Sequence, residues 1–299
     1  MLLASIDVGS NSTRFLVAEI KDDSLTPVKS GLITTRLGQG ITSGLLLENA
    51  MERTVSAIED FINEIKAYDA QKIIVGATSA VRDAANKEIF INLVKNRTGL
   101  DVRVLSGEEE ARASYQGVLS GVPLLADATL VLDVGGGSTE IIWPDNKGIN
   151  YVSLPVGAVR MTEGGHSEKE IGELLSSYLH IIRQQGKELS MVAVGGTATT
   201  LAAISLGNKQ YQPELVHGYI LSMVEINRIY YMLLEAGQEG RKKIIGLQPQ
   251  RADIILAGVN IIRKVLEGLS LREITVSESD ILHGLVLKLH QDMSKQKLE

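Results

Sequence analysis

Cysteine is absent from this chain of 299 residues. Its absence excludes disulfide bonds, thiolate nucleophiles and metal sites built from cysteine. A reducing compartment fits this composition, and we expect a cytoplasmic protein. Proline is scarce, with six residues against 29 glycines, which favours many tight strand-to-helix turns over disordered linkers.

Long hydrophobic runs and an excess of positive charge are also missing. No uncharged apolar run approaches the ~20 residues that a membrane span needs, so we expect no membrane partner. Residues 1–7 have neither a basic region nor a long apolar stretch and are typical of a strand, not of a signal peptide. The formal net charge of −6 argues against non-specific binding of DNA or RNA. It still permits a polyanionic substrate, because a cleft can concentrate arginines and backbone N–H groups locally.

Several hydrolase signatures are missing as well. The five histidines include no pair four residues apart and no H-E-x-x-H pattern, which argues against a zinc hydrolase. The sequence also contains no G-x-S-x-G nucleophile elbow and no P-loop.

The most informative feature that is present is a duplicated motif. Residues 7–13 and 133–139 match at five of seven positions, and each segment lies between two apolar runs. Both therefore predict a strand, a tight Gly/Ser turn and a second strand. A weaker pair, residues 73–78 and 192–197, predicts a strand that enters a small-residue turn and then a helix.

Two motif pairs at similar offsets predict two homologous halves, each a mixed α/β layer. We place the boundary near residues 121–123, which gives domains of residues 1–123 and 124–299. Hydrophobic spacing and capping patterns predict the other elements. These are helices over residues 50–67, 167–183, 250–267 and 280–293, and strands over residues 102–105 and 274–276.

The glycine-rich turns have chemistry that suits phosphate. Glycine lets a phosphate oxygen reach backbone N–H groups without obstruction by a Cβ atom, and serine or threonine adds hydroxyl donors. One such turn alone is more often a hairpin that serves geometry, but two related turns favour the grip of one anionic chain. The candidate phosphate ligands are Ser10, Asn11, Ser12, Gly135, Gly136, Gly137, Ser138, Thr139, Gly196 and Thr197.

Acidic residues stand where the strands meet these turns. Asp7 and Asp133 are candidate ligands of Mg²⁺, which prefers one or two carboxylates together with water and phosphate oxygens. The alternative is an aspartate that caps its own turn. Glu140, just beyond the second turn, is a candidate for holding the metal or orienting water, with a solvated strand-edge residue as the alternative.

Three consecutive glutamates begin a predicted helix, where acids complement the helix dipole. Glu109 lies three residues after Ser106 and fits a capping box. Glu110 has no capping role, and its helical neighbours Ser114 and Gly117 form a small-residue face that suits the wall of a cleft. Glu110 is therefore the candidate general base.

Three arginines near the turns are candidates for clamping phosphate oxygens: Arg82, Arg14 and Arg36. Any single arginine is more often a surface residue, so the proximity in sequence is the whole argument for them.

Together these segments resemble the Ppx/GppA family of exopolyphosphatases and guanosine pentaphosphate phosphohydrolases. The resemblance runs nearly end to end; each motif alone is weak, and their combination is specific. The matching motifs are Asp7-x-Gly-Ser-Asn-Ser, Arg36-Leu37-Gly38, Gly76-Ala77-Thr78-Ser79-Ala80-Val81-Arg82, Ser106-Gly-x-Glu-Glu-Ala111, Asp133-Val-Gly-Gly-Gly-Ser-Thr-Glu140, Leu154-Pro-x-Gly-Ala-Val-Arg160, Gly195-Gly-Thr197, His217-Gly218 and Pro249-x-Arg-Ala-Asp253.

The resemblance implies an α/β fold of the duplicated actin-like type, shared with acetate kinase and sugar kinases, with a cleft between two domains. It also implies Mg²⁺ or another divalent cation. By the same resemblance Glu110 is the catalytic base, Asp133 and Glu140 are the acids of the second phosphate motif, and Arg82 binds phosphate.

Two departures from the family pattern stand out. Longer members carry an extra helical C-terminal region, which this chain is too short to contain, and we therefore expect no processive action on long chains. Many members read Ser-x-x-x-Leu-Arg-x-Gly near the C-terminus, whereas Ser277 here leads to Leu282 and Gly284. The missing arginine at Leu282 is expected to alter a substrate or domain contact.

These observations predict an exopolyphosphatase that releases orthophosphate from the end of polyphosphate, with short chains preferred. A guanosine pentaphosphate phosphohydrolase would use the same residues, and the sequence does not separate the two. A kinase of the same superfold and a non-enzymatic, actin-like nucleotide-sensing scaffold are less compatible with Glu110 as a water activator. The sequence leaves a homodimer open.

Overall fold

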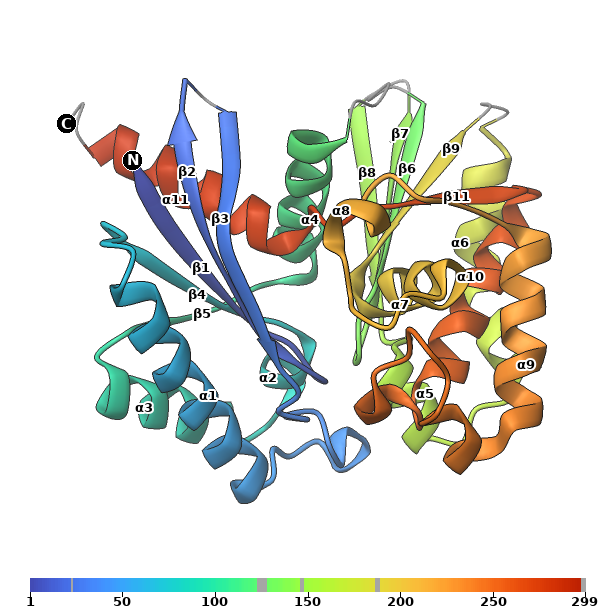
Figure 1. Cartoon of the computed structure of the whole chain (residues 1–299), viewed down its shortest axis with the longest axis horizontal. Helices are drawn as coiled ribbons and strands as arrows, with labels where there is room; N and C mark the ends of the chain where they lie inside the picture. The colour runs from blue at the N-terminus through green and yellow to red at the C-terminus, as the bar shows by residue number, and fades with distance from the viewer. Residues whose placement is uncertain (23, 123–127, 146–147, 186–188, 297–299) are drawn as a thin grey trace. The chain divides into compact units, whose positions relative to one another are not determined.

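In the computed structural model, residues 1–22, 24–122, 128–145, 148–185 and 189–296 are described. They form two compact units, one of Met1–Ser120 with Ser279–Glu299 and the other of Gly121–Glu278. Each unit is built on one mixed sheet covered by helices (Figure 1). Within the described ranges, no helix is both long and apolar enough to cross a bilayer.

The first unit contains a five-stranded sheet in the order β3-β2-β1-β4-β5. The pairs β3–β2 and β2–β1 are antiparallel, whereas the pairs β1–β4 and β4–β5 are parallel. Its elements are β1 Leu2–Val8, β2 Thr13–Lys21, β3 Ser24–Ile33, a 3-10 turn Ile41–Ser43, α1 Glu48–Lys66, β4 Ile73–Ala77, α2 Ser79–Asp83, α3 Lys87–Thr98, β5 Val102–Val104, α4 Gly107–Gly121 and α11 Ile281–Gln296.

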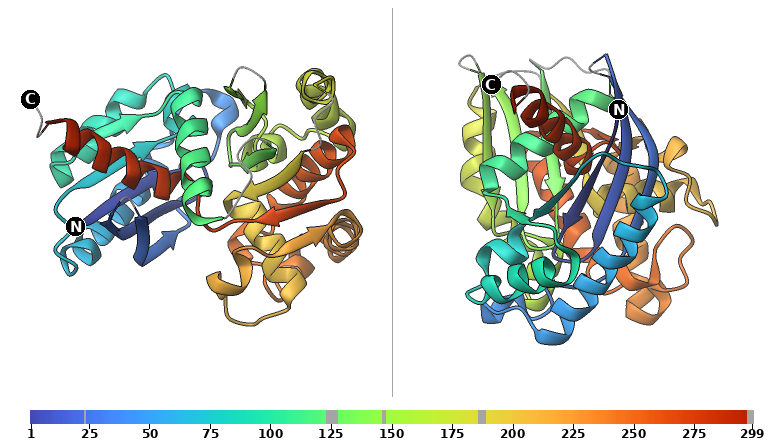
Figure 2. Two further views of the ribbon diagram at one scale, coloured as in Figure 1. Left: turned by 90° about the horizontal axis from the view of Figure 1, so that it is seen from above. Right: turned by 90° about the vertical axis from the view of Figure 1, so that its left-hand side faces the viewer.

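Both faces of β1 and of most of β2 are buried, since successive strand residues point to opposite sides and nearly all of them are covered. Phe15 of β2 meets Phe61 of α1, with ring centroids 4.8 Å apart. The next residue, Leu16, lies in a separate buried cluster with Val286 of α11. Helices α1 and α11 therefore cover opposite faces, as the two views of Figure 2 show.

Helix α11 corrects the division of the chain inferred from sequence. The sequence-based boundary assigned residues 124–299 to one domain, whereas the segment from Ser279 onward belongs to the first unit. The cause is an apolar face: Leu282, Val286 and Leu289 recur at helical spacing and are buried against β1 and β2. Position 282, where the family pattern has arginine and this chain has leucine, is thus a core position of the first unit.

The second unit contains a six-stranded sheet in the order β10-β11-β9-β6-β7-β8. From β8 to β11 it repeats the first sheet: three antiparallel strands, then two parallel ones, with β10 as an extra antiparallel edge. Its elements are β6 Thr129–Val134, β7 Thr139–Asp145, β8 Gly148–Leu154, α5 Ala158–Glu163, α6 Glu168–Arg183, β9 Ser190–Val194, α7 Gly195–Leu206, α8 Pro213–Val216, β10 Ile220–Ser222, α9 Met223–Arg241, a 3-10 turn Pro249–Arg251, α10 Ile255–Leu269 and β11 Glu273–Val276.

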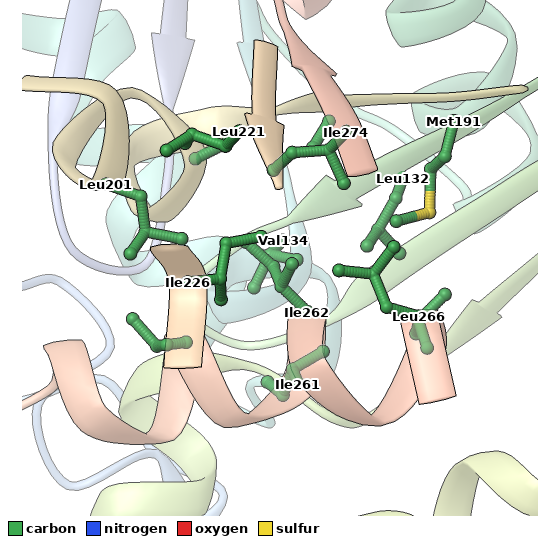
Figure 3. Close-up of a cluster of buried hydrophobic side chains, with 14 of the residues drawn as sticks. Leu132, Val134, Met191, Leu201, Leu221, Ile226, Ile261, Ile262, Leu266 and Ile274 are labelled. Carbon is green, nitrogen blue, oxygen red and sulfur yellow. The ribbon is translucent and has the colours of Figure 1, made fainter. Parts of the chain in front are cut away.

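The core of the second unit lies between this sheet and helices α7, α9 and α10. Figure 3 shows Leu132 and Val134 of β6 among the side chains of these helices, including Leu201, Ile226 and Ile262. Because the two sheets share their order and strand directions, the predicted α/β class and duplicated actin-like architecture are confirmed.

Most predicted elements are present at nearly the expected bounds. Helix α6 begins with the expected capping box, in which Ser167 and Glu170 each accept from the other's backbone N–H. The helix expected from residue 250 begins at Ile255 instead, because Pro249–Arg251 forms a separate 3-10 turn.

Candidate functional site

The first phosphate turn, residues 9–12, joins β1 to β2 in the first unit. The Gly9 N–H donates to the Ser12 carbonyl at 3.1 Å, which closes the turn. A neighbouring loop braces it, because the N–H groups of Arg36 and Gly38 donate to the carbonyls of Asn11 and Ser10. Arg36 therefore contributes backbone support at this turn.

Hydroxyl and amide groups gather at this end of the first sheet. Ser10 Oγ lies 3.1 Å from Ser79 Oγ, at the start of α2, and Asn11 Nδ2 donates to Ser12 Oγ at 3.0 Å. The Thr78 N–H donates to the Val8 carbonyl at 3.2 Å, which places the start of α2 beside the first turn. The structure thus brings together the first phosphate turn and the segment that carries Arg82.

Asp7 lies at the end of β1, directly opposite Arg14 on β2. Arg14 Nη2 is 2.6 Å from Asp7 Oδ2, and Arg14 Nη1 pairs with Asp280, just before α11. Burial raises the pKa of Asp7, against the charge of Arg14. Arg14 was predicted to bind phosphate, but two carboxylates occupy its guanidinium here.

Glu110 and Arg82, the predicted base and the predicted phosphate ligand, form an ion pair. Arg82 Nη1 lies 2.6 Å from Glu110 Oε2 and also donates to the Leu105 carbonyl at 3.2 Å. Glu110 is buried in the first turn of α4, while Arg82 stands on α2. The fold therefore joins a carboxylate and a guanidinium from two helices beside the first phosphate turn.

Two other features of α4 were predicted: a capping box at its start and a small-residue face behind Glu110. Glu109 and Ser106 form the expected capping box, with hydrogen bonds of 3.0 and 3.2 Å. The small-residue face behind Glu110 does not line a cleft, contrary to expectation: a Cβ at Gly117 would lie 1.8 Å from the Asp280 carbonyl oxygen. Glycine is needed there because the chain entering α11 packs directly on α4.

The second phosphate turn, residues 135–138, joins β6 to β7 and repeats the first. The Gly135 N–H donates to the Ser138 carbonyl at 3.0 Å. Residues at the start of α5 donate hydrogen bonds to carbonyl oxygens of the turn. The Val159 N–H donates to Gly136 O at 2.8 Å, and Arg160 Nε donates to Gly137 O at 2.8 Å. These bonds use carbonyl oxygens of the turn, not its N–H groups.

Asp133 and Glu140 are directly opposite each other on β6 and β7, and both are buried. Ser153 Oγ donates to Glu140 Oε1 at 2.6 Å. The alternative of a solvated Glu140 at a strand edge is therefore wrong. The equivalent pair in the first unit is Asp7 and Arg14, so two matching backbone sites differ in charge.

The hydroxyls after the second turn have different surroundings. Thr139 is fully buried, and its hydroxyl donates to the Val156 carbonyl. The hydroxyl proton that was predicted to bind phosphate is therefore already in a hydrogen bond. Ser138 Oγ is buried and makes no hydrogen bond within the described residues. Ser138 is thus the better placed of the two to bind a ligand oxygen.

Gly196 and Thr197 lie in the first turn of α7, next to the second phosphate turn. An ideal Cβ on Gly195 would lie 3.0 Å from Asp133 Oδ1, which puts the start of α7 against that carboxylate. An ideal Cβ on Gly196 would lie 2.1 Å from Arg251 Nη1. Sequence reasoning gave Arg251 no role, although the Pro-x-Arg-Ala-Asp motif contains it.

The carboxylates fit Mg²⁺ by their chemistry. Within the described residues there is no group of three or more histidine, aspartate or glutamate side chains placed to hold a metal. Mg²⁺, however, needs one or two carboxylates and takes its other ligands from water and phosphate. Asp7 Oδ1 is buried and has no hydrogen-bond partner among the residues that the structure describes, and Asp133 faces Glu140. Both places offer hard oxygen donors that a divalent cation would stabilise.

Comparisons with known proteins agree on one family. The model of the Ppx/GppA phosphatase family matches residues 16–292. The chain is 32% identical over 309 residues to a bifunctional 3-dehydroquinate synthase/phosphatase of Fusobacterium nucleatum, covering 96% of this chain but 46% of that protein. The chain thus spans about half the length of that relative.

Other relatives match over their whole length. Exopolyphosphatase 2 of Mycobacterium tuberculosis is 29% identical, with 96% of this chain and 98% of that protein covered. The crystal structure of an exopolyphosphatase from Cytophaga hutchinsonii superposes with a TM-score of 0.88 at 27% identity, covering 97% of each chain.

Proposed function

Because the chain belongs to the Ppx/GppA phosphatase family, we propose that it is an exopolyphosphatase that releases orthophosphate from the end of inorganic polyphosphate. The observation that carries the proposal is the partly buried ion pair of Glu110 with Arg82 beside the first phosphate turn. It combines a proton acceptor with a phosphate-binding cation. Binding at backbone N–H groups alone would not need such a carboxylate.

In the proposed reaction, a water oxygen bonds to the terminal phosphorus while the bridging P–O bond breaks. The electron pair of that bond leaves with the shortened chain. Glu110 takes the proton of the attacking water, and Arg82 neutralises phosphoryl oxygens as charge develops on them. Positioning and electrostatic stabilisation supply most of the catalysis in phosphoryl transfer.

The second unit contributes phosphate binding in this proposal. The N–H groups of Gly136 and Gly137, the Ser138 hydroxyl and the start of α7 at Gly196 and Thr197 offer donors to phosphate oxygens, while the Gly135 N–H closes the turn. Arg251, which lies over Gly196, adds a cation at the same helix end.

Asp7 in the first unit, and Asp133 with Glu140 in the second, are the carboxylates that would bind Mg²⁺ or another divalent cation. When bound, the cation would neutralise phosphate oxygens and help to orient the substrate. Asp7 would use Oδ1 for this purpose, because Oδ2 is engaged by Arg14.

Polyphosphate is favoured over guanosine pentaphosphate by the character of these groups. Every residue proposed here is a carboxylate, an arginine, a small hydroxyl residue, asparagine or glycine, and none of them offers an aromatic face to a base. The test is phosphate release from short polyphosphate, long polyphosphate and guanosine pentaphosphate, side by side, with and without Mg²⁺. Fast release from polyphosphate supports the proposal; release from guanosine pentaphosphate alone would replace polyphosphate with the nucleotide.

Glu110→Gln tests the proposed base and keeps the size of the side chain. General-base catalysis contributes about 10²–10⁴-fold, so we expect a loss of that order in kcat with KM largely kept. Glu109→Gln is the matched control, because Glu109 caps α4 and pairs with Arg103. If Glu109→Gln abolishes turnover while Glu110→Gln leaves it intact, the two roles are reversed.

A further inference from the structure

Arg14 is shared by two buried carboxylates that come from opposite ends of the chain. Its Nη2 lies 2.6 Å from Asp7 Oδ2, and its Nη1 pairs with Asp280 Oδ2. The side chains of Arg14, Asp7 and Asp280 are 23%, 7% and 6% exposed, respectively. All three belong to the first unit, on β2, on β1 and just before α11.

Asp280 is fixed by bonds that leave it little freedom. Its Oδ1 accepts from the Leu282 N–H at 3.1 Å and so caps the start of α11. Its N–H donates to His283 Nδ1 at 3.4 Å, and its carbonyl accepts from the Gly284 N–H at 3.2 Å. Both carboxylate oxygens of Asp280 are thereby engaged, whereas Asp7 Oδ1 has no hydrogen-bond partner in the described part of the chain.

The charges of this cluster do not cancel. Asp7 and Arg14 alone would form a neutral pair, and a cation approaching Asp7 Oδ1 would meet little attraction. Asp280 adds a second carboxylate to the same guanidinium, so the three side chains carry one net negative charge. At low exposure, such a charge acts more strongly than it would in water.

We propose that Asp280 is a positioning residue, which draws the charge of Arg14 away from Asp7 and keeps Asp7 Oδ1 attractive to a divalent cation. The inference rests on the proposed function, in which Asp7 is a ligand of that cation. Asp280 also touches the helix of the proposed base, since its carbonyl packs on Gly117 of α4.

The test uses Mn²⁺ as the probe, with free Mn²⁺ followed by electron paramagnetic resonance during titration of the full chain. Asp280→Asn keeps the shape and the capping oxygen but removes the charge. We expect it to weaken Mn²⁺ binding by about tenfold, the effect of one nearby charge at low exposure. Asp292→Asn changes a partly exposed acid on the same helix, and this variant should bind Mn²⁺ as the wild type does.

A double variant separates the charge from a merely structural role. Asp280→Asn combined with Arg14→Gln removes the charges of both Asp280 and Arg14. Asp7 then carries the one net negative charge of the cluster, as large as that of the wild type. Its Mn²⁺ affinity should therefore recover toward that of the wild type, and Asp280→Glu, which keeps the charge, should retain most of it. Equal Mn²⁺ binding by the wild type and Asp280→Asn, or a double variant that binds no better than Asp280→Asn, would overturn the inference.

Asp7→Asn distinguishes this inference from the proposed function beneath it. If Asp7→Asn loses Mn²⁺ binding but Asp280→Asn does not, only the role of Asp280 is wrong. If Asp7→Asn binds Mn²⁺ as the wild type does, the assignment of Asp7 as a ligand is wrong, and the role of Asp280 falls with it.

Discussion

At the residue scale, one substitution distinguishes two equivalent places in the two sheets. Each sheet has an aspartate at the end of its first strand, opposite the second residue of the next strand. That neighbour is Arg14 in the first unit and Glu140 in the second. The first place is therefore partly neutralised and depends on Asp280 for its charge, while the second combines two acids directly.

Gly196→Ala should lower substrate affinity with little effect on stability. The new Cβ would lie 2.1 Å from Arg251 Nη1, and the flexible end of the arginine would move aside. Losing one charge-assisted hydrogen bond of about 1.5 kcal/mol should raise the KM for polyphosphate about tenfold. Gly172→Ala is the control. Gly172 lies in α6, and its new Cβ would make an ordinary van der Waals contact at 3.4 Å with the Lys264 side chain. An unchanged KM in Gly196→Ala would remove Arg251 from the phosphate site.

Glu109 should give the fold a stability that disappears in acid. Hydrogen bonds from Ser106, and then from Arg103, lower the pKa of Glu109 below its ordinary value of 4.5. The stabilisation is therefore present above that ordinary value and is lost as the pH falls through the lowered one. We expect a small deficit in the Tm of Glu109→Gln at pH 7, because the group is partly exposed, and a deficit that shrinks as the pH falls below 4.5. A deficit that grows in acid would contradict this account.

At the element scale, helices α4 and α11 determine the positions of the acidic side chains Glu110 and Asp7 in the first unit. Helix α4 carries Glu110. Helix α11 crosses it so closely that Gly284 faces the backbone of α4, and Gly117 faces the backbone of Asp280 just before α11. Helix α11 also covers β1, whose end carries Asp7. A loosening of α11 should therefore disturb both acids of the first unit.

Leu285→Ala should destabilise the first unit by about 2–5 kcal/mol, the usual range for a large-to-small change in a core. Leu285 is fully buried on α11, beside Gly76 of β4 and Leu105. Leu234→Ala on α9 is the control, because Leu234 is exposed and loses little by truncation. Urea unfolding measures both variants. A change in Leu285→Ala no larger than that in Leu234→Ala would show that α11 contributes little to this core.

At the scale of the whole molecule, the chain is a duplicated α/β protein of the Ppx/GppA phosphatase family. The predicted class of enzyme, a phosphatase, is thereby confirmed at the level of the family. Its net charge of −6 leaves little spare positive charge for a long polyanion. The cations near the phosphate turns are single arginines, so binding should depend on a few terminal phosphates.

Short polyphosphate should accordingly be the better substrate at low salt. The distal part of a long chain would be repelled by an acidic surface, and salt should screen that repulsion, since the Debye length falls from about 10 Å at 0.1 M to about 3 Å at 1 M. The measurement is kcat/KM against chain length, at equal concentrations of chain ends and at two ionic strengths. A value that rises steadily with length at low salt would point to a basic track for the chain.

The sequence by itself determined the features that depend on short-range patterns. The two strand–turn–strand motifs, the capping boxes at Ser106 and Ser167 and the amphipathic helix α1 all follow from residues within a few positions of one another. Two motif pairs at similar offsets were enough to predict two homologous halves, and Glu110 was singled out because no local role remained for it.

Only the tertiary structure decided which of these residues meet. Asp280 lies 266 positions from Arg14, and its contact depends on the apolar face of α11 docking on β1 and β2. Because of that docking, the last helix belongs to the first unit, Asp280 pairs with Arg14, and Gly117 packs against Asp280. The placement of Arg251 over Gly196 has the same origin. Such contacts leave no periodic signal in the sequence, because they are fixed by which buried surfaces fit together, not by the order of residues along one element.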